Sequence, residues 1–88
     1  RGDKVALYNL GRMYRNGEGV KKNNVKAFVL YKLSATQGFF PAQNDLAHCY
    51  QHGIGTKKDD SKSFRYYRLA SDQGDILARC NLAYMPQE

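Results

Sequence analysis

A repeat with a period of 36 residues constrains the fold of this chain more than any other feature of its sequence. The segment GEGVKK at 17–22 returns as GIGTKK at 53–58. When residues 1–52 are placed over residues 37–88, 18 of the 52 pairs are identical, far more than the roughly one in twenty expected for unrelated positions. A fixed period of this length indicates a stack of repeated helical units.

Length and composition favour a small, ordered chain. The 88 residues are 42% hydrophobic and include only two prolines, which favours helical order over disorder. No apolar run approaches the roughly 18 residues of a transmembrane helix, and no signal-peptide pattern opens the chain. Because Gly2 aligns with Gly38 and Gly74, we expect the chain to be cut from a longer solenoid at a repeat boundary. No compartment is predicted.

The first repeat predicts two helices. The first should run from about Asp3 to Arg15, with Asp3 as the N-cap and an apolar stripe whose members are Ala6, Leu10, Met13 and Tyr14. Gly11, within this stripe, should let a neighbouring helix approach closely. The second helix should start at Asn23 or Asn24 and reach about Gln37. Its buried stripe should comprise Ala27, Phe28, Tyr31, Ser34 and Ala35, opposite a basic, solvated face.

The second repeat follows the same pattern, and a third begins. Pro41 fits the first turn of a third helix, Asp59 or Asp60 should cap a fourth, and Pro86 should end a fifth. The expected buried stripes are Ala42, Leu46 and Tyr50, then Phe64, Tyr67 and Ala70, then Ala78, Leu82 and Ala83. We therefore predict an all-α chain of about five helices, with repeats over about 3–38 and 39–74 and a partial repeat or capping helix over 75–88.

These residues resemble the Sel1-like repeat, a relative of the tetratricopeptide repeat. The motif of that family is Ala-x3-Leu-Gly-x2-Tyr-x2-Gly-x-Gly-Val, then Lys-Ala, an aromatic pair, Ala-Ala and a closing Gly. The first repeat matches at Ala6, Leu10, Gly11, Tyr14, Gly17, Gly19, Val20, Lys26, Ala27, Tyr31, Ala35, Gln37 and Gly38. The second matches at Ala42, Leu46, Tyr50, Gly53, Gly55, Lys62, Tyr66, Tyr67, Ala70, Gln73 and Gly74.

The resemblance implies an α-α superhelix, a right-handed solenoid of antiparallel helix pairs that acts in protein-protein assembly. The chain departs from the family pattern at Phe39, Phe40, Leu33 and Leu69, which are more apolar than usual. This extra apolar surface should meet either further repeats or a partner.

If the first helix of each pair lines a concave groove, as in tetratricopeptide relatives, the variable positions on these helices should bind the partner. They are Tyr8, Arg12, Arg15, Asn16, Asn44, His48, Gln51, His52 and Tyr84, with Cys80 beside them. Tyr and Arg often carry binding energy at interfaces. Arg12 and Arg15 could hold a carboxylate, so we expect a protein or peptide partner, and an acidic one in particular. Merely solvated surface is the alternative.

Other motifs indicate little chemistry. His48 and His52 have a spacing that can chelate a metal, but with no fixed third ligand we interpret them as ordinary polar surface and predict no metal or other cofactor. Each Gly-x-Gly follows a helix, so it is a turn and not a nucleotide loop. Cys49 and Cys80 lie at different repeat positions and should be free thiols.

No nucleophile with a base partner emerges, so we predict no catalytic residues and no small-molecule substrate. Two alternatives to a partner-binding scaffold remain. The unit could be a structural spacer, or its basic edge could bind nucleic acid or an anionic membrane. Both of these ligands are disfavoured because the net charge of +6 is spread along the chain. That edge comprises Lys21, Lys22, Lys57 and Lys58.

Overall fold

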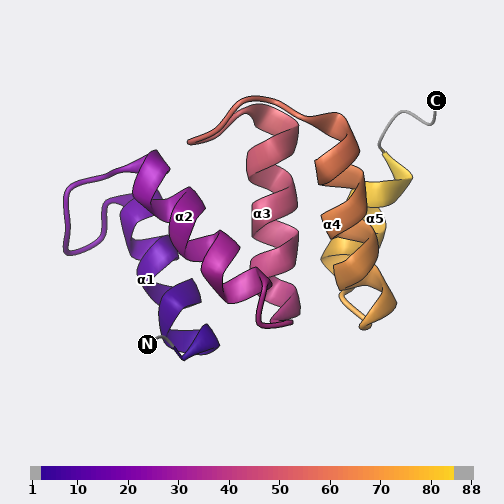
Figure 1. Ribbon diagram of the computed structural model, residues 1–88, viewed down its shortest axis with the longest axis horizontal. Coiled ribbons are helices and arrows are strands. Elements are labelled where there is room, and N and C mark those ends of the chain that lie inside the picture. Colours follow the sequence, from indigo (N-terminus) through magenta and orange to yellow (C-terminus); the bar gives the residue numbers. More distant parts are fainter. Residues whose placement is uncertain (1–2, 85–88) are drawn as a thin grey trace.

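The computed structural model describes residues 3–84 and contains five α-helices within that range (Figure 1). This confirms the prediction of an all-α chain. The helices are α1 (Lys4–Asn16), α2 (Asn24–Ala35), α3 (Phe40–His52), α4 (Asp60–Asp72) and α5 (Ile76–Ala83).

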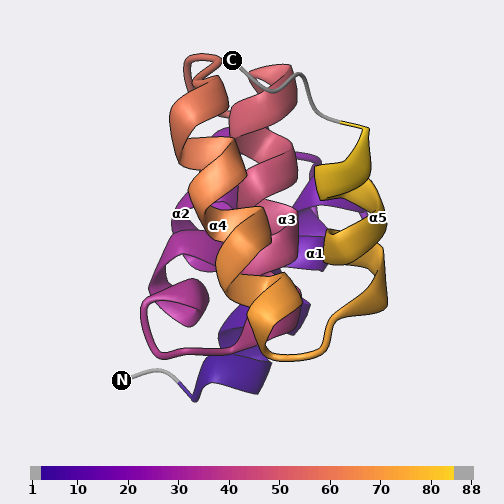
Figure 2. The same cartoon turned by 90° about the vertical axis from the view of Figure 1, so that its right-hand side faces the viewer.

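Each helix packs mainly against the next one along the chain, so the helices form a row and not a closed bundle. The described part of the chain is accordingly elongated, with extents of 38, 23 and 18 Å. Figure 2 shows two layers, with α1, α3 and α5 on one side and α2 and α4 on the other. We call the first layer the α1–α3–α5 face.

Local capping explains where most helices begin. The Asp3 carboxylate accepts from the Ala6 N–H at 3.2 Å, as predicted. For α2 and α4 the first of the two candidate caps is used, because Asn23 accepts from the Lys26 N–H at 3.0 Å and Asp59 from the Lys62 N–H at 3.1 Å. Each of these contacts satisfies an amide that the helix itself leaves unpaired.

The helix ends also follow from the sequence, with one difference. Gly17 and Gly53 end α1 and α3 in the left-handed conformation, with φ of 73° and 69°. This conformation strains residues that carry a Cβ atom. Helix α2 ends at Ala35 instead of Gln37 because the Gln37 N–H donates to the Ser34 carbonyl, which tightens the last turn.

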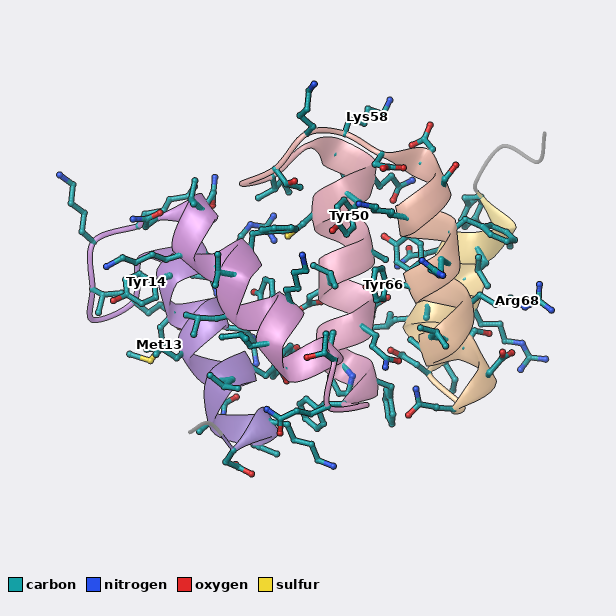
Figure 3. All side chains as sticks on the ribbon, viewed as in Figure 1. Met13, Tyr14, Tyr50, Lys58, Tyr66 and Arg68 are labelled. Carbon is teal, nitrogen blue, oxygen red and sulfur yellow. The ribbon has the colours of Figure 1, made fainter. Side chains whose placement is uncertain are left out.

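Two apolar clusters join the helices. The larger joins α2 to α3, and the smaller joins α3, α4 and α5. The larger consists of Ala27, Tyr31, Ala35, Ala42, Leu46, Cys49 and Tyr50. The smaller consists of Ala47, Tyr67, Ala70 and Ala78. The predicted stripes of the second to fourth helices therefore lie in the core, and Figure 3 shows Tyr50 and Tyr66 between α3 and α4, where their rings stack at 6.0 Å.

The repeated lysine that opens each second helix has a structural role. The Lys26 ammonium lies 5.3 Å from the centroid of the Tyr14 ring, and the Lys62 ammonium lies 5.6 Å from that of Tyr50. These two pairs are equivalent in the repeat. At such distances the positive charge is attracted to the face of the aromatic ring.

Several sequence predictions about burial are wrong, including that of Ala83, which is exposed at the end of α5. In the stripe of the first helix, Leu10 is 38% exposed and Met13 points outward (Figure 3), because no helix precedes α1 in the described chain to cover them. Its repeat equivalent Leu46 is 0% exposed, since α2 covers it. The outer face of α2 is not simply basic either, because Val25 and Leu33 are exposed there.

Helix α5 packs against α4, and its role as a capping helix stays a prediction. Ala78 is fully buried in the contact, whereas Ile76 is 71% exposed. Pro86, which we expect to end this helix, and Gly2, which marks the first repeat boundary, lie outside the described residues. Among residues 3–84 there is no helix both long and apolar enough to cross a membrane.

Candidate functional site

A chain of polar side chains crosses the α1–α3–α5 face. The Tyr8 side chain of α1 lies near the Asp45 carboxylate of α3, whose charge raises the pKa of the Tyr8 hydroxyl. The Asn44 amide donates to Asp45 at 3.4 Å, and the Asn81 amide of α5 donates to the Asn44 carbonyl oxygen at 3.3 Å. We call Tyr8, Asp45, Asn44 and Asn81 the polar row. It connects three helices that do not follow each other in sequence.

The repeat itself explains why these side chains meet. Asn9, Asp45 and Asn81 are separated by 36 residues each, and so are Tyr8 and Asn44. Successive first helices of a stack present equivalent positions on the same face. The polar row thus arises from neighbouring positions of one repeat pattern, filled by different residue types.

Asp45 is the ionisable carboxyl group of the polar row. Burial raises the pKa of its carboxyl, whereas the nearby Tyr8 hydroxyl, the hydrogen bond from Asn44 and the charges of Arg12 and Arg15 lower it. Burial outweighs the other effects, so the net shift is upward. Burial and the Asp45 charge raise the pKa of Tyr8 to about 12, so its hydroxyl keeps its proton and remains a donor at neutral pH.

Two arginines lie beside the row on α1. The guanidinium carbon of Arg12 lies 5.8 Å from the centroid of the Tyr8 ring, and Arg12 is exposed. Arg15 is half-buried, and its positive charge lowers the pKa of both the Asp45 carboxyl and the Tyr31 hydroxyl. The face therefore combines exposed positive charge with a half-buried carboxylate that is already hydrogen-bonded.

The residues predicted to line the groove differ in their availability. Asn44 is only 9% exposed because it is engaged in the polar row. Gln51 accepts from the Tyr67 hydroxyl at 3.0 Å, which ties α3 to α4. Asn16 and Tyr84 are exposed at the ends of α1 and α5. Arg12 and the two histidines are the predicted residues best placed to meet a ligand.

The two histidines of α3 lie against each other. Their ring centroids are 4.4 Å apart, with an angle of 53° between the ring planes. Burial lowers the pKa of His48, with smaller contributions from His52 and Arg15. Within residues 3–84, no cluster of three or more His, Cys, Asp or Glu side chains could hold a metal ion.

Both cysteines are free, as expected. Cys49 is buried in the larger cluster, and burial raises the pKa of its thiol to about 11, so it remains protonated at neutral pH. Cys80 is exposed on α5. The lysines of the predicted basic edge are all exposed in two equivalent loops, and Figure 3 shows Lys58 directed away from the helices.

Asp45 and Asn81 were not among the site residues predicted from the sequence. A usable signal was present, because Asn9, Asp45 and Asn81 are polar at every occurrence of one repeat position that adjoins the predicted groove. Such a position is expected to face the same surface in each unit. Polar residues that recur at one repeat position can therefore reveal a row of contacts between units.

A row of antiparallel helix pairs with a polar face on its first helices defines a repeat protein of the α-solenoid class. The family model for the Sel1 repeat matches residues 4–39 and 40–75. The chain therefore belongs to the Sel1 repeat family. Sel1 repeats generally serve as protein-interaction scaffolds, and the fold is usually non-catalytic.

Solved structures agree with this assignment. A Sel1 repeat protein from Oxalobacter formigenes is 36% identical, with a TM-score of 0.93 over 96% of this chain and 63% of that one. The protective antigen c5321 of uropathogenic Escherichia coli, which has a Sel1-like repeat fold, is 34% identical, with a TM-score of 0.91 over 94% of this chain and 18% of that one. The present chain thus spans less than two thirds of either protein.

A more distant structure shares the fold alone. Helicobacter pylori cysteine rich protein B is 24% identical, with a TM-score of 0.84 over 90% of this chain and 59% of that one. No match was found among curated protein sequences.

Proposed function

We propose that this chain is a scaffold module that binds an acidic segment of a partner protein on its α1–α3–α5 face. The observation that carries this proposal is the polar row with its two flanking arginines. Arg12 and Arg15 present positive charge at one side of the row, where a partner carboxylate can pair with a guanidinium through two parallel hydrogen bonds.

The row itself supplies a rigid platform for such a segment. The Asn81 amide of α5 donates to Asn44 of α3, and the Asn44 amide donates to the neighbouring Asp45. Groups that are positioned before binding lose little side-chain freedom when a ligand arrives. Asp45 would repel a partner carboxylate placed directly over it, so the acidic group belongs beside Arg12, and the neutral backbone of the segment belongs over the amides.

We further propose that another helix pair packs against the open side of α1. Leu10 is exposed, whereas its equivalent Leu46 is covered by the second helix of the preceding repeat. The same kind of helix would cover Leu10. Fusion of a copy of residues 39–74 ahead of residue 3 should then raise the melting temperature, and an unchanged melting temperature would count against this contact.

Selection from a library of random peptides displayed on phage tests the proposed function. Peptides selected on the immobilised chain should be enriched in Asp and Glu. Their affinity should fall by about tenfold or more in the double variant Arg12→Ser/Arg15→Ser, since a charge-assisted pair contributes about 1.5–3 kcal/mol. The matched control is Arg65→Ser/Arg68→Ser, which removes the same charge from exposed positions of α4.

The control separates the proposal from its alternatives. An equal loss in both double variants would indicate non-specific attraction to positive charge, as a basic edge would produce. A steep fall of affinity with salt that depends on Lys21, Lys22, Lys57 and Lys58 would likewise indicate binding at that edge. Failure to enrich any peptide would favour the structural spacer.

A further inference from the structure

We propose that His48 and His52 form a two-histidine binding site for a divalent transition-metal ion, with Ni²⁺, Zn²⁺ and Cu²⁺ as the chemical class. This inference does not depend on the proposed function, and it replaces the interpretation of the two histidines as ordinary polar surface that the sequence alone favoured. The two residues occupy positions four apart on the last turns of α3, and their ring centroids lie 4.4 Å apart.

The ring spacing suits a shared ion. Imidazole nitrogens bind Zn²⁺ at about 2.0–2.1 Å, so two nitrogens on a tetrahedral ion are roughly 3.4 Å apart. Rings whose centroids are 4.4 Å apart can bring one nitrogen of each to that separation by rotation of the side chains. The backbone of α3 need not move. Histidines four apart on one helical face are also the pair that holds zinc in helical metalloprotease motifs.

The surroundings leave room for further ligands. His52 is exposed and His48 is half-buried, so the open side of the pair faces solvent. Because residues 3–84 offer no group of three metal-binding side chains here, water would fill the other coordination positions. A donor from a molecule bound on this face could replace one water. Arg15 lies near His48 and its charge opposes a cation, so the affinity should be moderate.

Only the second repeat carries this pair. The positions equivalent to His48 and His52 in the first repeat hold Arg12 and Asn16, which cannot replace the two imidazoles. The stripe of buried residues that builds α3 does not require histidine at either position, because the core of that helix is formed by Ala42, Leu46, Cys49 and Tyr50. The histidines can therefore be substituted without opening a cavity in the core.

Isothermal titration with NiCl₂ and ZnCl₂ at pH 7.5 tests the site. The intact chain should bind one ion, and its melting temperature should rise with metal concentration because the ion binds the folded helix. His48→Ala and His52→Ala should each weaken binding by at least about tenfold, since the second imidazole acts at high effective concentration once the first is bound.

A matched control keeps the number of histidines constant. The double variant His52→Ala/Asn16→His moves one imidazole to the equivalent exposed position of α1, and it should bind no better than His52→Ala. Cys80→Ser should retain the affinity of the intact chain within about twofold. Circular dichroism of every variant checks that the helices are intact.

Three results would overturn the proposal. The first is equal affinity of the intact chain and the single-histidine variants. The second is full affinity in the double variant with the displaced histidine, which would show that the spacing on α3 is irrelevant. The third is loss of binding in Cys80→Ser alone, which would assign the metal to the exposed thiol.

Discussion

Gly55 packs closely against the backbone carbonyl of Asn24. A Cβ atom added at Gly55 would overlap the Asn24 carbonyl oxygen and would lie 3.0 Å from the Cβ atom of Phe28. The loop between α3 and α4 thus contacts the start of α2 in the preceding repeat, and Figure 1 shows it reaching toward that end of α2. The second Gly-x-Gly turn is therefore also a contact between repeats.

The first prediction compares Gly55→Ala with Gly19→Ala. Both glycines have positive φ, at 71° and 76°, so each substitution should cost about 1–2 kcal/mol of unfolding free energy from backbone strain. At Gly19 the nearest atom to an added Cβ is the Met13 methyl at 3.5 Å, which is an ordinary contact. Gly55→Ala should cost about 1–3 kcal/mol more because of overpacking.

Urea unfolding followed by circular dichroism measures both free energies. Equal destabilisation by the two substitutions would mean that the loop does not pack against α2 as the structure shows.

The second prediction concerns the two equivalent leucines. Leu46→Ala removes a fully buried side chain and should cost about 2–5 kcal/mol. Leu10→Ala removes a side chain that is 38% exposed on the uncovered side of α1, and should cost about 1 kcal/mol or less of unfolding free energy. Thermal and urea unfolding of the two variants provide the comparison. Similar losses at both positions would contradict the exposure of α1.

The third prediction concerns the pH dependence of stability. The folded state raises the pKa of Asp45 above the unfolded value, so the folded state binds a proton more tightly there. This contribution is favourable while Asp45 is protonated and is lost as the pH rises from about 4, the unfolded pKa, through the folded pKa. Asp45→Asn keeps the size and a carbonyl oxygen of the side chain but removes the titration.

Urea unfolding at several pH values between 4 and 7 isolates this effect. The other carboxylates are common to both proteins, so their effects cancel when the unfolding free energy of Asp45→Asn is subtracted from that of the intact chain. This difference should fall as the pH rises, because Asp45 loses its proton. A difference that stays constant or grows with pH would show that burial does not dominate at Asp45.

Most of the fold could be predicted from the sequence because it depends on local signals that the repeat presents twice. Caps such as Asp3 and helix-ending glycines such as Gly17 act within a few residues of their own position. Apolar stripes of period 3.6 identified the buried faces of α2, α3 and α4. The burial of Leu10 was wrongly predicted because a stripe marks a face that can be covered, and only a neighbouring helix decides whether it is covered.

The site was less predictable, because its contacts join different repeats. The 36-residue offset correctly placed Tyr8, Asn44 and the two histidines on equivalent helices, but it did not indicate which of them pair. The proximity of Asp45 to Tyr8 and the hydrogen bond of Asn44 with Asn81 depend on the spacing between neighbouring helix pairs. That spacing follows from packing contacts such as those of Gly55 with Asn24 and is not encoded in any one repeat.

Mapping of a selected acidic peptide by amide chemical shifts tests the central claim most directly. Two-dimensional ¹H–¹⁵N spectra of the labelled chain, recorded during titration with such a peptide, should change most at exposed residues of α1 and α3 near Arg12 and His48. They should change little on the outer face of α4 around Arg65 and Arg68. Shifts that are confined to α2 and α4, or to the loops that hold Lys21 and Lys57, would contradict recognition on the α1–α3–α5 face.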